Sequence, residues 1–354
     1  MSASTLIEPR ESAAPPTLRG CEQPSVSVIV PCYNEERFIG KTLENLVAQY
    51  PAEAYEIIVV DGMSEDATLD VVQQFQNSHP QSSVRLVLNP DRSIPKALNK
   101  GIASANGEII ARMDAHTVPS PGYIRRCVQV LTQGDAEVVG MPCLVQPGGE
   151  AVSARAIALA VSHPFGIGDA RYRLKGGSEL QEAVDTVAFA CFRKSLWSRL
   201  GGYDESLLTN EDYDFNYRAR LQGDRVILDR SEYCNYFARE SFSKLISQYT
   251  RYGMWKARMI RLHPRSLKLR HTIAPSFVAS IILLGALGMW KSAAWMLLAG
   301  EFGLYFILAV GFAVHAVRRA KETVGVLFAL PLVFFLVHLS WGASFLLGLI
   351  RQPR

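Results

Sequence analysis

The sequence predicts an α/β domain with a mostly parallel sheet, followed by helices that cross a membrane. Short β-branched runs alternate with amphipathic helical segments over residues 26–141, which is typical of parallel strands joined by crossover helices. Three later runs are apolar enough, and long enough, to cross a hydrocarbon layer about 30 Å thick; they occupy residues 273–290, 293–314 and 324–350. The alternative, buried helices of a soluble protein, fits poorly with runs that carry so few charges.

The elements of the α/β part follow from the period of the apolar residues. Strands are expected at residues 26–30, 56–60, 84–88, 108–113 and 137–141. Helices are expected to begin at residue 35, to follow a cap at residues 64–66, and to span residues 94–105 and 123–131. Because the strands are almost continuously apolar, we expect helices to bury the sheet on both faces.

Composition divides the chain into four parts. Residues 1–24 are rich in Ser, Ala, Pro and Glu and lack the apolar core of a secretory signal, so we expect a disordered tail. Residues 25–240 form the α/β domain, residues 241–272 a basic amphipathic segment beside the membrane, and residues 273–350 three transmembrane helices. The basic segment either lies on the membrane face or packs as an ordinary helix on the α/β domain.

The charge distribution predicts which side of the membrane the domain occupies. A net charge of +4 over 354 residues argues against a nucleic-acid partner. Residues 241–300 contain no Asp or Glu, and basic side chains crowd before the first apolar run and again at residues 318–321. Positive residues stay cytoplasmic, so we expect a multi-pass protein of the inner (cell) membrane with its first 270 residues in the cytoplasm. Three crossings would put the C-terminus on the far side, although Arg351 and Arg354 leave a re-entrant segment open.

Two ionisable residues lie inside the predicted membrane segments, Glu301 and His338. A charged group at that depth is costly and usually has a partner. We therefore expect either that Glu301 pairs with His338 or that Glu301 reaches toward the membrane surface.

Polar residues follow three of the predicted strands directly, at residues 31–35, 61–64 and 114–116. In open α/β sheets ligands bind beyond the carboxyl ends of the strands, so these segments are expected to form one site. Asp114 and His116 are two residues apart, and in an extended chain they face the same way and could bind one divalent cation. The alternative is a turn cap at Asp114 and an exposed, unused His116.

Five blocks in this order resemble glycosyltransferase family 2, whose members have the GT-A fold and use nucleotide sugars. They are SVIVPCYNEE, IIVVDGMSEDAT, NKGIASANGEIIARMDAH, GGYDESLLTNEDYDFNYR and QYTRY. The resemblance runs from residue 26 to about residue 252. The chain departs from the family pattern in having Asp-Gly-Met at residues 61–63, His116 in place of a second acid, and Tyr252 in place of Trp.

The resemblance implies a nucleotide-sugar site in the first half of the chain, with Asp61 on the uracil side. The site residues expected are Pro31, Tyr33, Asn34, Glu35, Asp61 and Asp114, to which we add Arg92 and Lys96. The bases Arg92 and Lys96 could reach a phosphate, and the alternative is that both face solvent.

The resemblance also implies a metal and a catalytic base. Asp114 and His116 would bind Mn²⁺ or Mg²⁺, and the imidazole shifts the preference toward Mn²⁺. Asp212 would be the base that takes the acceptor proton. The residues expected to contact the acceptor or the diphosphate are Glu211, Gln248, Arg251 and Tyr252. Without the resemblance, the acids at residues 211–214 would read as a solvated helix start.

The function implied is an inverting transferase that moves a sugar to a lipid-linked glycan acceptor. The group it resembles most is the membrane-bound bacterial exopolysaccharide transferases of the succinoglycan-biosynthesis type, whose donors are most often UDP-hexoses; GDP stays open. The partners expected are the donor, a polyprenyl-linked glycan and the membrane. Three alternatives remain: a processive synthase, which Tyr252 disfavours, a polyprenyl-phosphate sugar transferase, and a membrane-tethered nucleotide-sugar sensor without activity.

Overall fold

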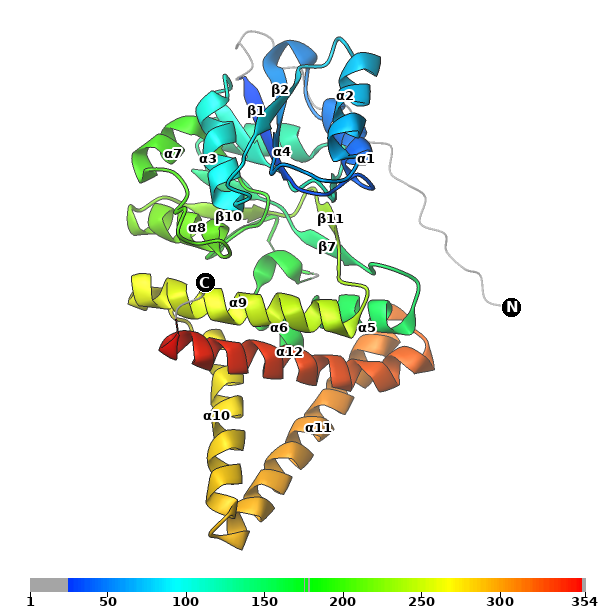
Figure 1. Cartoon of the computed structure of the whole chain (residues 1–354), viewed down its shortest axis with the longest axis vertical. Helices are drawn as coiled ribbons and strands as arrows, with labels where there is room; N and C mark the ends of the chain where they lie inside the picture. Colours follow the sequence, from blue (N-terminus) through cyan, green and yellow to red (C-terminus); the bar gives the residue numbers. More distant parts are fainter. Residues whose placement is uncertain (1–24, 175, 178, 352–354) are drawn as a thin grey trace, which may run out of the picture.

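The computed structural model describes residues 25–174, 176–177 and 179–351. The predicted disordered tail at residues 1–24 lies outside the described residues. The described chain has an α/β domain at one end, a layer of helices beneath it, and two long helices that project away from both (Figure 1).

The main sheet of the described residues has eight strands in the order β3-β2-β1-β4-β9-β6-β10-β8. Its strands are β1 Val26–Cys32, β2 Tyr55–Asp61, β3 Val84–Leu88, β4 Ile109–Arg112, β6 Val138–Gly140, β8 Gln181–Ala183, β9 Cys191–Arg193 and β10 Val226–Asp229. The pairs β1–β2, β1–β4, β2–β3 and β6–β10 are parallel. The prediction of a mostly parallel sheet is therefore confirmed.

Strand β9 is antiparallel to both of its neighbours, β4 and β6, and was not predicted. It is three residues long, too short to show a period. A second, small sheet has the order β5-β11-β7 and lies beside the carboxyl end of β4. Its strands are β5 Thr117–Pro119, β7 Cys143–Gln146 and β11 Cys234–Phe237.

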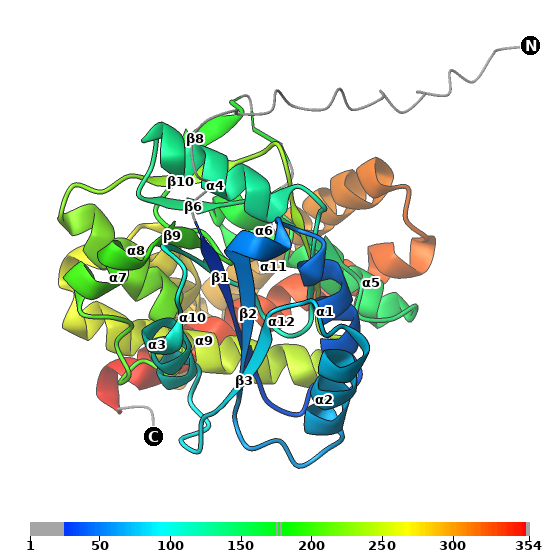
Figure 2. The same ribbon diagram turned by 90° about the horizontal axis from the view of Figure 1, so that it is seen from above.

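Helices cover both faces of the main sheet, as the apolar strands predicted. Figure 2 shows α1 and α2 on one side of β1–β3, and α3, α7 and α8 on the other. One buried cluster joins α1, α2 and α4 to the sheet, and a second joins α3, α7 and α8 to it. The bounds are α1 Ile39–Val47, α2 Thr68–Ser78, α3 Ile94–Ser104, α4 Tyr123–Gln133, α7 Lys194–Leu200 and α8 Glu211–Leu221.

The helical layer joins the α/β domain to the apolar end of the chain. It contains α5 Val152–Ala160, α6 Pro164–Ile167, α9 Phe242–Leu262 and α12 Val324–Ile350. A buried cluster draws apolar side chains from α5, α9, α11 and α12, so these helices share one core. The predicted basic segment is thus largely the helix α9, which packs between the α/β domain and α12 (Figure 1).

Three helices of the described chain are long and apolar enough to cross a membrane: α10 Arg270–Gly288, α11 Ser292–Ala320 and α12. Only α10 and α11 project away from the α/β domain, as a hairpin, whereas α12 runs along α9 (Figure 1). The three crossings and the side of the C-terminus stay predictions, although α12 does not project with the hairpin. The Leu349 carbonyl at the end of α12 accepts a hydrogen bond of 3.5 Å from Arg261 of α9.

Small residues explain this placement of α12. A Cβ atom on Gly253 of α9 would overlap the Ser344 hydroxyl and the Trp341 carbonyl of α12, and one on Gly342 would overlap the Ala274 carbonyl of α10. Such close approach of helix backbones is what small residues allow in apolar surroundings. The close packing holds α12 against both α9 and α10.

The expected pairing of Glu301 with His338 is wrong. Glu301 accepts a hydrogen bond from Ser280 within the hairpin. His338 lies 2.7 Å (Nε2) from the Phe165 carbonyl of α6 and 2.9 Å (Nδ1) from the Tyr305 hydroxyl of α11. Because a carbonyl only accepts, Nε2 donates and Nδ1 accepts from Tyr305. His338 of α12 therefore links α11 of the hairpin to α6 of the helical layer through two hydrogen bonds.

Candidate active site

The loops that follow β1, β2 and β4 meet at one edge of the sheet, as the strand pattern predicted. The Asn34 amide donates to the Ser64 hydroxyl (2.9 Å), and the Asn34 side-chain oxygen accepts from the Glu65 amide (2.8 Å). Glu35 Oε1 lies 2.9 Å from His116 Nδ1, which joins the β1 loop to the β4 loop. Because β1 lies between β2 and β4, this edge is where ligands bind in open α/β sheets.

Asp61 shapes the turn after β2. Its side chain is fully buried, Oδ2 accepts from the Ser64 amide (2.8 Å) and Oδ1 accepts from the Ser64 hydroxyl (2.5 Å). Both carboxylate oxygens are thus used within the loop that carries residues 61–64. The contact of Asp61 with a nucleotide stays a prediction.

Arg92 and Lys96 have different surroundings. Arg92 donates to the Tyr33 hydroxyl (3.2 Å) and to Glu65 (2.7 Å), with its guanidinium 5.2 Å from the centre of the Tyr33 ring. Arg92 and Tyr33 therefore form one exposed unit at the sheet edge. Lys96, in the first turn of α3, forms an exposed ion pair at 2.8 Å with Asp91 of the loop that precedes the helix.

The segment after β4 carries Asp114 and His116 on a turn, not on an extended strand. Strand β4 ends at Arg112, and the Thr117 amide donates to the Asp114 carbonyl at 3.1 Å. The expectation that i and i+2 geometry aligns the two side chains is therefore wrong. Both side chains nevertheless line the same cavity, since the turn folds them toward it.

The environment of His116 fits a metal ligand. Glu35 bonds to Nδ1, which leaves Nε2 for a cation, and metal-bound histidines commonly have such a carboxylate partner. Burial lowers the pKa of His116, but the hydrogen bond to Glu35 and the charges of Asp114 and Glu35 raise it overall. No group of three or more His, Cys, Asp or Glu side chains within the described residues could hold a metal, so a cation here needs further ligands from the substrate.

A cavity of about 1000 Å³ opens beside this turn. Its walls come from the β4 loop, from α6, from the start of α8, from α9, and from the apolar helices α10, α11 and α12. The predicted residues that line it are Asp114, His116, Glu211, Asp212, Gln248, Arg251 and Tyr252. Pro31, Tyr33, Asn34, Glu35, Asp61, Arg92 and Lys96 do not line it and lie with the loops at the sheet edge.

The three acids at the start of α8 occupy different environments. Asp212 is half-buried, lines the cavity and accepts a hydrogen bond from the Tyr213 amide (2.7 Å). Asp214 is fully buried and forms ion pairs with Arg218 (2.7 Å) and His263 (2.9 Å). Burial raises the pKa of Glu211 to about 7, Arg112 opposes that rise and Asp212 adds to it. Asp212 is therefore the acid of the three that is open to a substrate.

Arg112, which the sequence reasoning missed, connects the two groups of acids. It is 8% exposed, its Nε lies 3.3 Å from Asp114 and its Nη1 lies 2.9 Å from Glu211. It occupies the last position of the buried strand β4. An arginine inside an apolar strand, directly before the Asp-x-His segment, is the signal that could have identified it.

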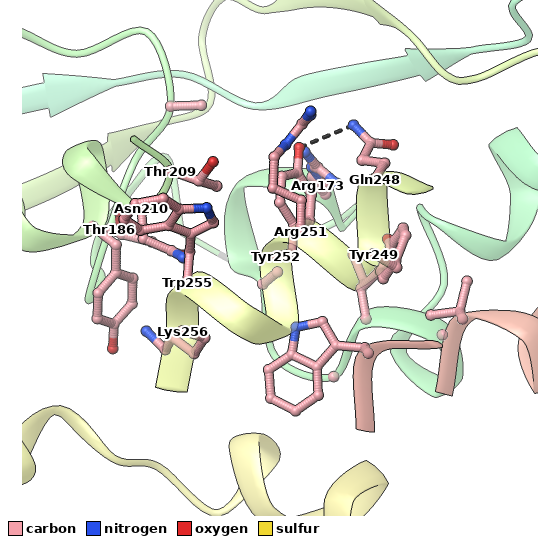
Figure 3. Close-up of a pocket in the computed structure, with 18 of the residues that line it drawn as sticks. Arg173, Thr186, Thr209, Asn210, Gln248, Tyr249, Arg251, Tyr252, Trp255 and Lys256 are labelled. Atoms are coloured by element: carbon pink, nitrogen blue, oxygen red, sulfur yellow. Dashed lines mark hydrogen bonds between the residues drawn. The ribbon is translucent and has the colours of Figure 1, made fainter. Parts of the chain in front are cut away.

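Helix α9 brings Gln248, Arg251 and Tyr252 to the cavity beside Arg173 (Figure 3). Gln248 donates to the hydroxyls of Tyr252 (2.9 Å) and Tyr236 (3.1 Å). Arg251 is exposed and takes part in no ion pair found among the described residues. This wall therefore offers hydroxyl and guanidinium donors to a ligand, since both amide protons of Gln248 go to the two tyrosines.

Known proteins resemble this chain along most of its length. The model of the family Glycosyl transferase family 2 matches residues 27–201. The succinoglycan biosynthesis protein ExoA of Rhizobium meliloti (strain 1021) is 27% identical over 90% of this chain and 93% of that protein. A dolichyl N-acetyl-alpha-D-glucosaminyl phosphate 3-beta-D-2,3-diacetamido-2,3-dideoxy-beta-D-glucuronosyltransferase of Methanococcus voltae is 27% identical over 92% of this chain and 97% of its own.

A solved structure shows the same fold. The mannosyltransferase PcManGT of Pyrobaculum calidifontis, in complex with GDP-Man and Mn²⁺, superposes with a TM-score of 0.62 at 22% identity, over 90% of this chain and 87% of that one. At that identity the likeness establishes the fold alone. Together with the family match, it shows that the chain is a glycosyltransferase of the GT-A fold whose residues 27–201 are a glycosyl transferase family 2 domain.

Proposed function

We propose that this chain is an inverting transferase that moves a hexose from a nucleoside diphosphate sugar to a lipid-linked glycan acceptor at a membrane surface. The supporting observation is a single cavity lined by Asp212, by the pair Asp114 and His116, and by side chains of helices long enough to cross a membrane. A donor site, a base and a lipid-facing wall therefore adjoin one another. UDP is the proposed nucleotide, by the family resemblance.

The reaction needs one base and one leaving group. Asp212 accepts the proton of an acceptor hydroxyl, whose oxygen forms a bond to the anomeric carbon. The bond from that carbon to the diphosphate oxygen breaks with its electron pair, and the nucleoside diphosphate leaves. Because the acceptor attacks opposite the leaving group, the configuration inverts and no covalent enzyme intermediate is needed.

The remaining residues hold the reacting groups in place. Asp114 and His116 would hold a divalent ion, which would supply Lewis-acid stabilisation of the leaving diphosphate. Arg112 fixes Asp114 and Glu211 relative to each other. Arg251 offers further donors to phosphate oxygens or to the acceptor, and Gln248 orients the hydroxyls of Tyr236 and Tyr252 beside it.

We further propose that the α/β domain lies on the cytoplasmic face of the cell membrane. The hairpin of α10 and α11 would enter the bilayer, while α9 and α12 would lie near its surface. The basic residues before α10 and at residues 318–321 support this side. The relatives that cover nearly the whole chain are named for succinoglycan biosynthesis and for transfer to a dolichyl-linked sugar.

The direct experiment offers the full-length protein in nanodiscs a panel of UDP- and GDP-sugars, with Mn²⁺ and a bacterial membrane lipid extract. Mass spectrometry identifies the nucleotide released and the glycolipid formed, and NMR gives the anomeric configuration. We expect one nucleotide sugar to yield a glycolipid longer by one sugar, with inverted configuration. Donor binding without transfer, retained configuration, or a long polymer would each overturn part of the proposal.

A further inference from the structure

The cavity continues from the carboxylates past α9 into an apolar arm between α6, α10 and α12. The lining here is mostly apolar, from Phe165, Ile273, Ala274, Phe277, Val337 and Trp341, and it also includes Tyr305 and His338, which are hydrogen-bonded to each other. Two of its walls, α10 and α12, are helices long and apolar enough to cross a membrane. A nucleotide sugar is polar and would gain no favourable contact from such a wall, so the arm fits a hydrocarbon chain.

A buried lysine side chain lies on the wall of the same cavity, over the Tyr213 ring near the start of α8. Lys256 of α9 is 4% exposed and lines the cavity. Its contacts are the Tyr213 ring, 3.1 Å from Nζ to the centre, and the Met259 sulfur at 3.7 Å. No carboxylate in the described chain lies within ion-pair distance of Lys256. A buried charge without a counter-ion is costly, and a bound anion would remove that cost.

Arg173 is a second cation of this kind. Its guanidinium lies 5.0 Å from the centre of the Tyr236 ring and 5.5 Å from that of Tyr172. Its Nε is buried and has no hydrogen-bond partner among the described residues. Figure 3 shows Arg173 beside Gln248 and Arg251, on the cavity wall.

Other buried cations of the cavity already have partners. Arg112 pairs with Asp114 and Glu211, and Arg270 pairs with Asp185, which also binds Lys268 at 3.1 Å. Lys256 and Arg173, by contrast, lie against aromatic rings and have no carboxylate within ion-pair distance in the described chain. Burial, Arg270 and Lys268 lower the pKa of Lys256, and a nearby phosphate would raise it.

Resting on the proposed function, we infer that this cavity binds the lipid of the acceptor itself: a polyprenyl phosphate or diphosphate, with its phosphate at Lys256 and Arg173 and its first isoprene units in the apolar arm. Carboxylates, the two basic side chains and apolar side chains of α10 and α12 all line this one cavity. A lipid-linked sugar has the matching groups, which are hydroxyl, phosphate and hydrocarbon. The glycan would then be directed toward Asp212.

The test uses the full-length protein in nanodiscs and, as probe, a C55 polyprenyl phosphate that carries a photoreactive diazirine in its isoprene chain. Irradiation followed by mass spectrometry should label α10 or α12. K256M and R173Q should each lower labelling about tenfold, the loss for one charge-assisted contact. Unlabelled C55 phosphate should compete with the probe at least about tenfold better than decyl phosphate, and inorganic phosphate should compete weakly.

Matched variants of α10 separate blocking of the arm from general damage. A274F should reduce labelling because Ala274 lines the arm, whereas A279F, on the exposed side of the same helix, should label as the unmodified protein does. Donor binding, followed by calorimetry, should stay unchanged in A274F, K256M and R173Q, which shows that these variants are folded.

Several outcomes would overturn the inference. They are unchanged labelling in both K256M and R173Q, equal competition by inorganic phosphate, or label placed outside α6, α10 and α12. D212N separates this inference from the proposed function, because that variant should lose transfer and keep lipid labelling. Lipid labelling in a protein that never transfers sugar would leave the site in place and refute the function.

Discussion

The two ends of the cavity balance their charges differently. Near the sheet, Arg112 joins Asp114 to Glu211, and Glu35 contacts His116. Near the long apolar helices, Lys256 and Arg173 have aromatic neighbours and no carboxylate partner in the described chain. The first end is assembled before any ligand binds, while the second needs an anion to complete it.

Charged residues that are paired and buried therefore differ from charged residues that face the cavity, although both kinds look the same in the sequence. Asp212 and Asp214 are two positions apart in one helix, yet Asp214 is fully paired and buried, while Asp212 faces the cavity. Completed pairs stabilise the fold, and side chains left open to the cavity are available to a substrate. Variants at each type of position should therefore differ in what they damage.

The largest expected effect is that of D212N on the chemical step. Losing a general base should lower kcat by about 10²–10⁴-fold, with donor affinity within about twofold of the original, measured by single-turnover transfer and by calorimetry. D214N is the comparison, since it loses partners in Arg218 and His263 and should lower Tm instead. Near-normal turnover in D212N would remove Asp212 from the role of base.

The next effect concerns the metal at Asp114. D114A should abolish the response of transfer to added Mn²⁺ and cost about 10²-fold or more in kcat, since a metal supplies several kcal/mol of charge stabilisation. D70A, at an exposed acid of α2, should titrate with Mn²⁺ as the unmodified protein does. A normal titration curve for D114A would count against its assignment as a ligand.

Packing between α9 and α12 should be sensitive to one added side chain. G253V places carbon atoms against Ser344 and Trp341 and should destabilise the protein by about 1–3 kcal/mol, the usual cost of overpacking. Thermal unfolding in detergent measures this change. The control is G285V in α10, where an added Cβ meets no atom within 4 Å, and whose Tm should change much less.

The smallest expected effect is a pH dependence from Glu211. Its pKa is raised to about 7, chiefly by burial, so the folded state holds the proton more tightly than the unfolded state does. The protonated Glu211 side chain therefore adds to the free energy of unfolding. This contribution is complete below the unfolded pKa of about 4.5 and is lost as the pH rises through about 7, and the free energy of unfolding falls by no more than about 1.4 kcal/mol per pH unit. E211Q should flatten the dependence of Tm on pH between 5 and 8, and an unchanged slope would contradict this origin.

Local pattern was sufficient for most of the α/β fold. The predicted helix at residues 94–105 corresponds to α3 and the predicted strand at residues 84–88 to β3, because apolar period determines both. The reversed strand β9 could not be predicted from its three residues, since its place depends on pairing with β4 and β6. The course of α12 also depends on distant partners, because its length and composition equally fit a crossing.

The site was only partly predictable for a related reason. Asp114, His116 and Asp212 stand in recognisable motifs, and the structure brings all three to one cavity. The roles of Arg112, Arg173 and Lys256 depend on which carboxylates lie nearby in space, and this cannot be read from neighbours in the chain. Whether each motif residue acts as the resemblance implies stays a prediction for the experiments above.

The course of α12 has a practical consequence for reporter fusions. Because Leu349 lies against Arg261 of α9, a protein fused after the last residue should share a compartment with the α/β domain. A fluorescent protein attached there should fluoresce in the cytoplasm, and alkaline phosphatase attached at the same point should stay inactive. The opposite pair of signals would mean that the last helix threads through the bilayer in the cell.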